Sequence, residues 1–141
     1  GRSLLWGRQS YRWNKWDFEA NAKEGIAVDW PIRYDDLAPW YSYVEKFAGI
    51  QGSYEGLDVL PDSEFLPAME MNIVEKDIAN NLKKKFNGSR HMFIGRSANI
   101  TQPKPEQNRV NCQYRNKCWL GCPYGAYFST QSSTLPAAKI P

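Results

Sequence analysis

The chain has 141 residues, a length that suits a single domain. Its 18 basic and 15 acidic residues leave a net charge of +3, which is too small and too scattered to indicate a nucleic-acid-binding protein. No stretch approaches the ~20 consecutive apolar residues of a transmembrane segment, so we expect none in this sequence.

The first half of the chain contains one strongly periodic segment. Residues 1–17 mix glycine, arginine and tryptophan without a period, and we interpret them as extended or looped chain. A helix is predicted over residues 35–48, because apolar side chains recur there on one helical face. Gly49 follows as a left-handed cap that would end this helix. The apolar positions are Leu37, Trp40, Tyr41, Val44, Phe47 and Ala48.

A second helix is predicted to begin at Asn72, after a long loop over residues 50–70. Asn72 and Glu75 resemble a capping box, and Asn87-Gly88 would end the helix. We expect its buried stripe to be Val74, Ile78, Leu82 and Phe86.

The last third of the chain has little regular patterning. Residues 91–94 are predicted as a short strand, residues 95–125 lack a period, and residues 127–138 are either a helical turn or extended. The predicted fold class is therefore α+β, mostly helix and irregular loop with few short strands. Because so much irregular backbone is unusual in a free-standing domain, we interpret the chain as a fragment of a larger protein.

Three cysteines, Cys112, Cys118 and Cys122, lie within eleven residues. Structural zinc takes four ligands, and the only histidine, His91, is distant in sequence, so we predict no metal site. Free or partly paired thiols fit this pattern better, and a Cys118–Cys122 or Cys112–Cys122 disulfide stays open. His91 is interpreted as a surface or structural residue, and we predict no catalytic residue in this chain.

The opening segment from Gly1 to Arg8 is the strongest candidate for a binding site. Two glycines six residues apart permit close approach of a ligand to the backbone, and they flank Ser3 and Trp6. Such a segment can line a flat ring system and offer amide donors to it. An aromatic-rich turn without a ligand is the alternative interpretation.

Three segments in order resemble the glucose–methanol–choline (GMC) oxidoreductases. The start is similar to the second flavin signature of that family, with Gly1 as its second glycine. Residues 17–45 resemble the family's "DF…GW…Y-x-D-L-x-P-Y-Y…E" stretch. Residues 121–138 are similar to the "GC-P-x-G-A…S…L-P-A-A" run of the branch that includes gluconate and sugar dehydrogenases.

This resemblance implies a two-domain, FAD-dependent parent enzyme that oxidises CH–OH groups of a sugar, polyol or other alcohol. Residues 1–17 would form its flavin-contacting region, and residues 18–141 part of its substrate domain. Leu5 stands where some relatives carry a histidine bonded to the flavin, which implies non-covalent FAD. The implied cofactor-binding residues are Gly1, Arg2, Ser3, Leu5, Trp6, Gly7 and Arg8.

The family's G-x-G-x-x-G fingerprint and its carboxy-terminal catalytic histidine have no counterpart here, so the isolated fragment is expected to be inactive. The implied partners are a small-molecule alcohol or sugar substrate and an electron-acceptor subunit, and the compartment stays open. The alternative function is a non-enzymatic carbohydrate- or protein-binding module that uses exposed aromatic side chains.

Overall fold

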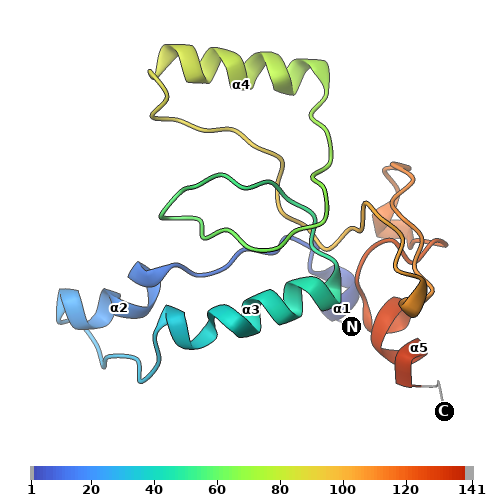
Figure 1. Cartoon of the computed structure of the whole chain (residues 1–141), viewed down its shortest axis with the longest axis horizontal. Coiled ribbons are helices and arrows are strands. Elements are labelled where there is room, and N and C mark those ends of the chain that lie inside the picture. Colours follow the sequence, from blue (N-terminus) through green and yellow to red (C-terminus); the bar gives the residue numbers. More distant parts are fainter. Residues whose placement is uncertain (1, 139–141) are drawn as a thin grey trace.

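The computed structural model describes residues 2–138, so Gly1 and residues 139–141 lie outside the described part of the chain. Helices joined by long loops make up this part (Figure 1), which confirms the expectation of a mostly helical and irregular fold. The α-helices are α1 (Arg2–Leu5), α2 (Lys15–Glu24), α3 (Tyr34–Ala48), α4 (Ile73–Lys85) and α5 (Leu135–Ala138). Two 3₁₀ turns, η1 (Pro105–Gln107) and η2 (Cys118–Leu120), and one π-turn, η3 (Thr130–Thr134), complete the elements.

Helix α3 confirms the first predicted helix and its cap. At its start the Arg33 backbone N–H donates to Asp36 Oδ2 at 2.8 Å. At its end Gly49 has φ +75°, and a Cβ there would lie 2.5 Å from Ile100 Cγ2. Only glycine therefore combines this turn with the close approach of the 96–100 segment.

Helix α4 confirms the second predicted helix and its capping box. Asn72 Oδ1 accepts from the Glu75 N–H at 2.9 Å, and Glu75 Oε2 accepts from the Asn72 N–H at 2.8 Å. Beyond Lys85, Asn87 turns into the left-handed region with φ +48°, as the Asn-Gly signal predicts.

The expectation of extended or looped chain over residues 1–17 is wrong at both ends. Residues 2–5 form α1, and α2 begins at Lys15. Asn14 Oδ1 caps α2 by accepting from the Trp16 N–H at 2.8 Å, and Asp17 returns a bond to the Asn14 N–H at 2.7 Å. Because Phe18 is the only buried residue of α2, the helix has too little apolar periodicity to be found from that signal.

The predicted strand at residues 91–94 is also wrong, because this segment is extended but has no bridge to another segment. Within residues 2–138, β-structure is limited to isolated bridges. Residues 96–100 lie at their centre: Ser97 bridges both Gln9 and Gln51, and Asn99 bridges Tyr127. This segment therefore joins the amino-terminal turn, the chain after α3 and the chain before η3.

The apolar core around this central segment is small. Ala48, Ile50 and Ala98 are buried together, with Phe65 and Phe128 at their edge. A core of this size buries little apolar area, so much of the cohesion must come from polar contacts.

Buried arginines provide those contacts. Arg109, which is 1% exposed, donates to the carbonyl oxygens of Ala48 (2.7 Å), Gly125 (3.0 Å) and Ala126 (3.1 Å). Burial lowers the pKa of Arg109 to about 10, against the effect of the nearby Glu106 carboxylate, so the guanidinium is charged at pH 7. Its fixed fork of donors thus joins the end of α3 to the chain before η3.

A second buried arginine fixes the amino-terminal segment to α3. Arg12 Nε donates to Glu45 Oε1 at 3.0 Å and Arg12 Nη2 to Glu45 Oε2 at 2.7 Å, and their side chains are 4% and 9% exposed. Arg12 also donates to the Tyr34 hydroxyl at 3.0 Å and to Ser42 Oγ at 2.9 Å. The pair is bidentate and fully hydrogen-bonded, which is the geometry that a buried ion pair requires.

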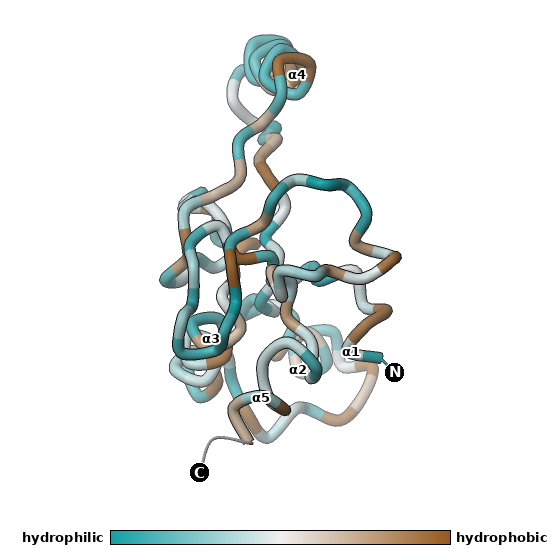
Figure 2. The backbone as a smooth tube through the Cα atoms, turned by 90° about the vertical axis from the view of Figure 1, so that its right-hand side faces the viewer, coloured by the Kyte–Doolittle hydropathy of each residue, from teal (hydrophilic) through white to brown (hydrophobic). Residues whose placement is uncertain are grey.

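Helix α4 stands apart from the other elements on two extended legs (Figures 1 and 2). We call residues 69–95 the α4 arm and the remaining described residues the body. The expected buried stripe of α4 is wrong at three of its four positions, because Val74 is 66%, Ile78 44% and Phe86 39% exposed, whereas Leu82 is half-buried. The helical period is present, but no surface of the body covers it.

Candidate functional site

The predicted flavin-contacting residues lie on α1 and on the tight turn that follows it. Arg2, Ser3 and Leu5 belong to α1, whereas Gly1 lies outside the described residues. Gly7 and Arg8 follow with φ +69° and φ +66°, two consecutive left-handed residues. The structure therefore brings Ser3, Leu5, Trp6, Gly7 and Arg8 into one compact turn.

Contacts with the carboxy-terminal third anchor this turn. Ser3 Oγ lies 3.1 Å from Thr130 Oγ1, and the Ala98 N–H donates to the Arg8 carbonyl oxygen at 2.8 Å. The Arg8 guanidinium lies 3.7 Å above the Tyr127 ring and donates to the Leu4 carbonyl oxygen at 3.1 Å. Arg8 is buried and its Nε has no hydrogen-bond partner in the described structure.

The opposite side of the turn is open. Leu5 is 85% exposed, and no atom lies within 4 Å of the position that a Gly7 Cβ would occupy. A flat group can therefore approach this backbone without meeting a side chain.

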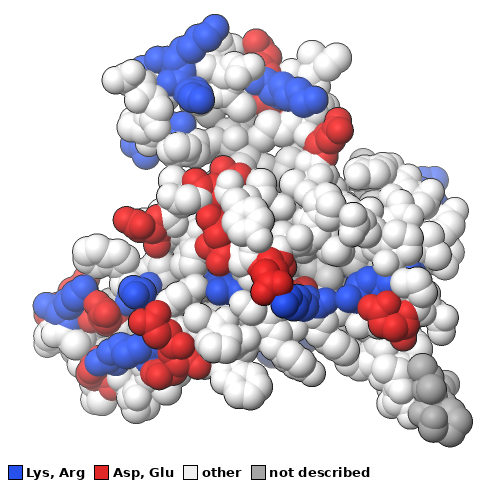
Figure 3. Space-filling view, in the orientation of Figure 1, with Lys and Arg blue, Asp and Glu red and all other residues white. Residues whose placement is uncertain are grey.

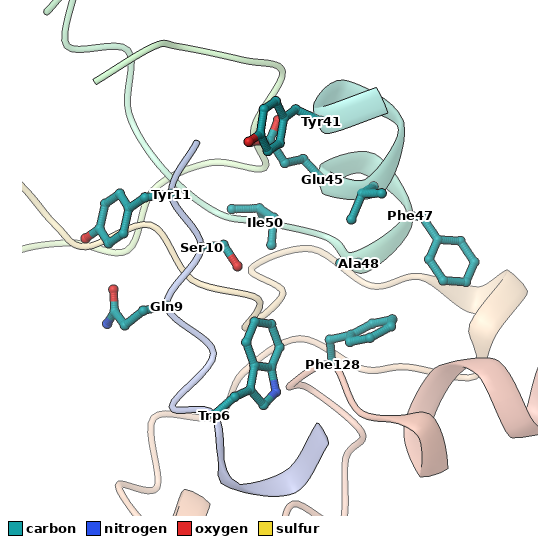
Figure 4. A pocket seen from close by; sticks show the side chains of 11 residues that line it. Trp6, Gln9, Ser10, Tyr11, Tyr41, Glu45, Phe47, Ala48, Ile50 and Phe128 are labelled. Atoms are coloured by element: carbon teal, nitrogen blue, oxygen red, sulfur yellow. The ribbon is translucent and has the colours of Figure 1, made fainter. Parts of the chain in front are cut away.

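An apolar groove of about 330 Å³ begins at Trp6 (Figure 4). The Trp6 and Phe128 rings meet edge to face at 6.5 Å between centroids, and Phe47 meets Phe128 at 5.9 Å. The volume lies at the lower end of the range for small-molecule sites. Its lining residues are Trp6, Gln9, Ser10, Tyr11, Tyr41, Val44, Glu45, Phe47, Ala48, Ile50 and Phe128.

Of these lining residues, the sequence analysis assigned only Trp6 to a ligand. Tyr41, Val44 and Phe47 were expected as one packing face of α3, and Val44 is instead exposed beside the groove. Phe128 was missed, although it lies two residues after the Gly-Cys-Pro motif of residues 121–126. Periodicity finds helix faces, but it cannot show which distant segment meets them.

Acid–base groups in the groove are already engaged. Glu45, the carboxylate of the lining, binds Arg12 through both oxygens. His91 lies on the α4 arm and lines a separate hollow with Glu55 and Lys83. The Glu45 carboxylate is therefore held by an ion pair, and the rest of the groove lining is mainly apolar and aromatic.

The three cysteines line one small cavity of about 40 Å³ on the loop around η2. All three are half-buried free thiols, so neither of the two open disulfide pairings is formed. Across residues 2–138, no cluster of three or more His, Cys, Asp or Glu side chains has the spacing to hold a metal ion.

The helices in the described part of the chain include none that is long and apolar enough to cross a membrane. No family model matches this sequence.

The chain is similar to the fructose dehydrogenase large subunit of Gluconobacter japonicus. The two are 23% identical over 145 residues, which cover 99% of this chain and 26% of that protein. The chain thus spans about a quarter of the length of this curated relative. The similarity links the chain to a subunit of a dehydrogenase, that is, to the oxidoreductases.

Proposed function

We propose that this chain is part of an FAD-dependent dehydrogenase of the GMC type, which oxidises CH–OH groups of a sugar, polyol or other alcohol. The observation that carries the proposal is the open backbone at Gly7 beside the apolar groove at Trp6. The similarity to a dehydrogenase subunit along almost the whole chain supports it. Residues 1–17 are proposed as the flavin-contacting region and residues 18–141 as part of the substrate domain.

The residues present fit a flat, hydrogen-bonding ring. The open space above Gly7 leaves room for one face of such a ring, and Trp6 borders it with an aromatic edge. The free Nε of the buried Arg8 is an unused donor in the same turn.

Bound FAD would supply hydride-accepting chemistry, and this chain would position the ring and shelter it from water. Backbone amides around Ser3 and Gly7 orient the ring, and Trp6 with Phe128 excludes water from its edge. Leu5 has no nucleophilic atom, so the flavin is held without a covalent bond. Because Glu45 is occupied by Arg12, the proton of the alcohol passes to a base elsewhere in the longer enzyme.

A further subunit is proposed to take the electrons from the reduced flavin. The relative is itself a large subunit, and its name implies a smaller companion.

The test is flavin occupancy of the full-length protein with Trp6→Ala and Gly7→Val combined. The matched control combines Trp119→Ala with Gly56→Val, because Trp119 is exposed and Gly56 has φ +63° with open space around it, like Gly7. We expect at least about a tenfold loss of bound flavin by absorbance for the site variant, corresponding to the lost packing of one large ring. Equal flavin occupancy in the site variant and the control variant would show that the turn is not part of the flavin site.

A separate experiment tests whether the flavin is attached without a covalent bond. Denaturation of the full-length protein followed by ultrafiltration should release all flavin into the filtrate. Flavin that stays with the polypeptide would contradict the inference from Leu5.

A second candidate function is a carbohydrate-binding module without enzymatic activity. A hollow of about 460 Å³ favours it, since Trp16 and Tyr34 line it together with Lys15, Asp58 and Pro61. Trp16 is 62% exposed, as a stacking platform for a sugar would be. A flavin-free full-length protein whose Trp16→Ala variant loses affinity for maltose would favour this function over the dehydrogenase.

A further inference from the structure

The apolar stripe of α4 is largely exposed to solvent in the described structure. Val74, Ile78 and Leu82 are four residues apart and lie on one face of the helix. None of the residues of α4 is buried, and Phe86 continues the stripe at its end. An amphipathic helix normally buries such a face against another element.

The charges of the α4 arm are divided between its two ends. Glu70, Glu75 and Asp77 lie at the amino-terminal end, and residues 83–85 are three consecutive lysines at the carboxy-terminal end. Figure 3 shows these groups on the lobe formed by the arm, with the lysine cluster on the side away from most of the acidic residues. Lys76 is an exception at the acidic end, where its Nζ lies 4.0 Å from Glu70 Oε2.

We infer that α4 pairs in antiparallel orientation with α4 of a second copy of this chain. In such a pair the acidic end of each helix lies beside the basic end of the other, and the two helix dipoles oppose. A parallel pair would instead place the two lysine clusters side by side. The charge division of α4 therefore complements that of a second copy, and it favours the antiparallel direction.

The register follows from the positions of the side chains. The midpoint between Ile78 and Leu82 coincides with the midpoint between Glu75 and Lys85, which lie on the same face of the helix. A single two-fold axis at this point places Ile78 of each copy beside Leu82 of the other. The same axis brings Glu75 of each copy to the level of Lys85 of the other, and both residues lie on the face of the helix that carries the stripe.

The position of the arm makes this pairing accessible. Figures 1 and 2 show α4 held away from the body by its two legs, so the body does not obstruct a helix that approaches the stripe. The interface is self-complementary, and a two-fold pair closes without unpaired ends. This inference does not depend on the proposed flavin site.

The first test measures the mass of the full-length protein by sedimentation equilibrium, from nanomolar to high micromolar concentration. We expect a monomer–dimer equilibrium whose dissociation constant rises about a hundredfold or more for Ile78→Asp, since two apolar contacts are lost per dimer. The matched control is Ile26→Asp, because Ile26 is 78% exposed on the loop between α2 and α3. It should leave the dissociation constant unchanged.

The second test examines the charge pairs. Glu75→Lys and Lys85→Glu should each weaken the dimer by about fivefold to tenfold, and the double exchange should restore it. Circular dichroism of each variant checks that α4 still forms. A double variant as weak as the single ones would overturn the antiparallel register.

Other occupants of the stripe give different outcomes. A protein that stays monomeric at every concentration overturns the inference, and so does a dimer that Ile78→Asp leaves intact. A monomer that co-sediments with phosphatidylglycerol vesicles in an Ile78-dependent manner would assign the stripe to a lipid surface, against the homodimer.

Discussion

The body buries charged side chains, whereas the α4 arm leaves apolar side chains exposed. In the body, Arg12 and Glu45 are almost fully buried charges, and Arg109 is enclosed among carbonyl oxygens. In the arm, Val74 and Ile78 are exposed apolar residues on a regular helix. Hydropathy alone would have placed these two groups the other way round.

The difference shows that a side chain is buried when the folded chain provides groups that interact with it. A guanidinium can be enclosed when carboxylate, hydroxyl or carbonyl oxygens accept from its nitrogens, as they do around Arg12 and Arg109. An apolar stripe needs only a second surface, but α4 has none within the described chain. The body is thus held by specific polar contacts, and substitutions should affect the two regions very differently.

The largest expected effect comes from breaking the buried ion pair of the body. Glu45→Ala would leave the Arg12 charge enclosed without its carboxylate, and should lower the free energy of unfolding by about 4 kcal/mol. The control is Lys46→Ala, which removes an exposed pair with Glu64 at 2.6 Å and should cost less than about 0.5 kcal/mol. Urea unfolding measures both, and equal losses would contradict the assignment.

An isoleucine-to-alanine substitution in the body and in the α4 arm compares the two regions most directly. Ile100→Ala opens a cavity in the body at a fully buried side chain, and should cost about 3 kcal/mol. Ile78→Ala removes an exposed side chain from the arm, and should cost less than about 0.5 kcal/mol when the protein is dilute enough to be monomeric. A large loss at Ile78 in the monomer would show that the arm packs on the body after all.

A smaller and pH-dependent effect is expected at Asp62. Partial burial opposes ionisation there, but N–H groups of Glu55 (3.1 Å) and Gly56 (2.8 Å) and the Arg96 guanidinium hold the pKa of Asp62 below its ordinary value of 3.8. The carboxylate therefore stabilises the fold at neutral pH, and this stabilisation is lost as the pH falls below 3.8 through the lower folded-state pKa.

Asp62→Asn should accordingly cost about 2 kcal/mol at neutral pH. The difference from the parent protein should shrink in acid, because the parent loses the same interaction when Asp62 is protonated. Asp58→Asn, an exposed position on the same loop, is the control. A difference that stays constant down to acid pH would contradict the role of the carboxylate charge.

Local signals predicted the two longest helices well. The period and the Gly49 cap define α3, and the Asn72–Glu75 capping box defines the start of α4. The Asn14–Asp17 capping box would equally have found α2, but α2 lacks the apolar period on which the prediction relied. The extended segment at residues 91–94 has the composition of a strand, yet a strand also requires a neighbour.

For the candidate site, the sequence indicated the turn but not its surroundings. Trp6 and Gly7 were found from the glycine spacing and the family resemblance. Their neighbour Phe128 and the anchor Thr130 come from more than a hundred residues away, and no pattern in the sequence connects them. For the same reason the sequence analysis found the apolar stripe of α4 but wrongly expected it to be buried, and it did not predict the burial of Arg109.

The sequence by itself determined where helices begin and end, because caps and periods act over a few neighbouring residues. Only the tertiary structure decided which faces are enclosed, which arginines find acceptors, and which groove adjoins Trp6. Those properties depend on pairs of segments far apart in the chain, such as residues 8–10 with 96–98 and 98–100 with 126–128. The contact between such segments depends on the folded chain as a whole, so local composition does not predict it.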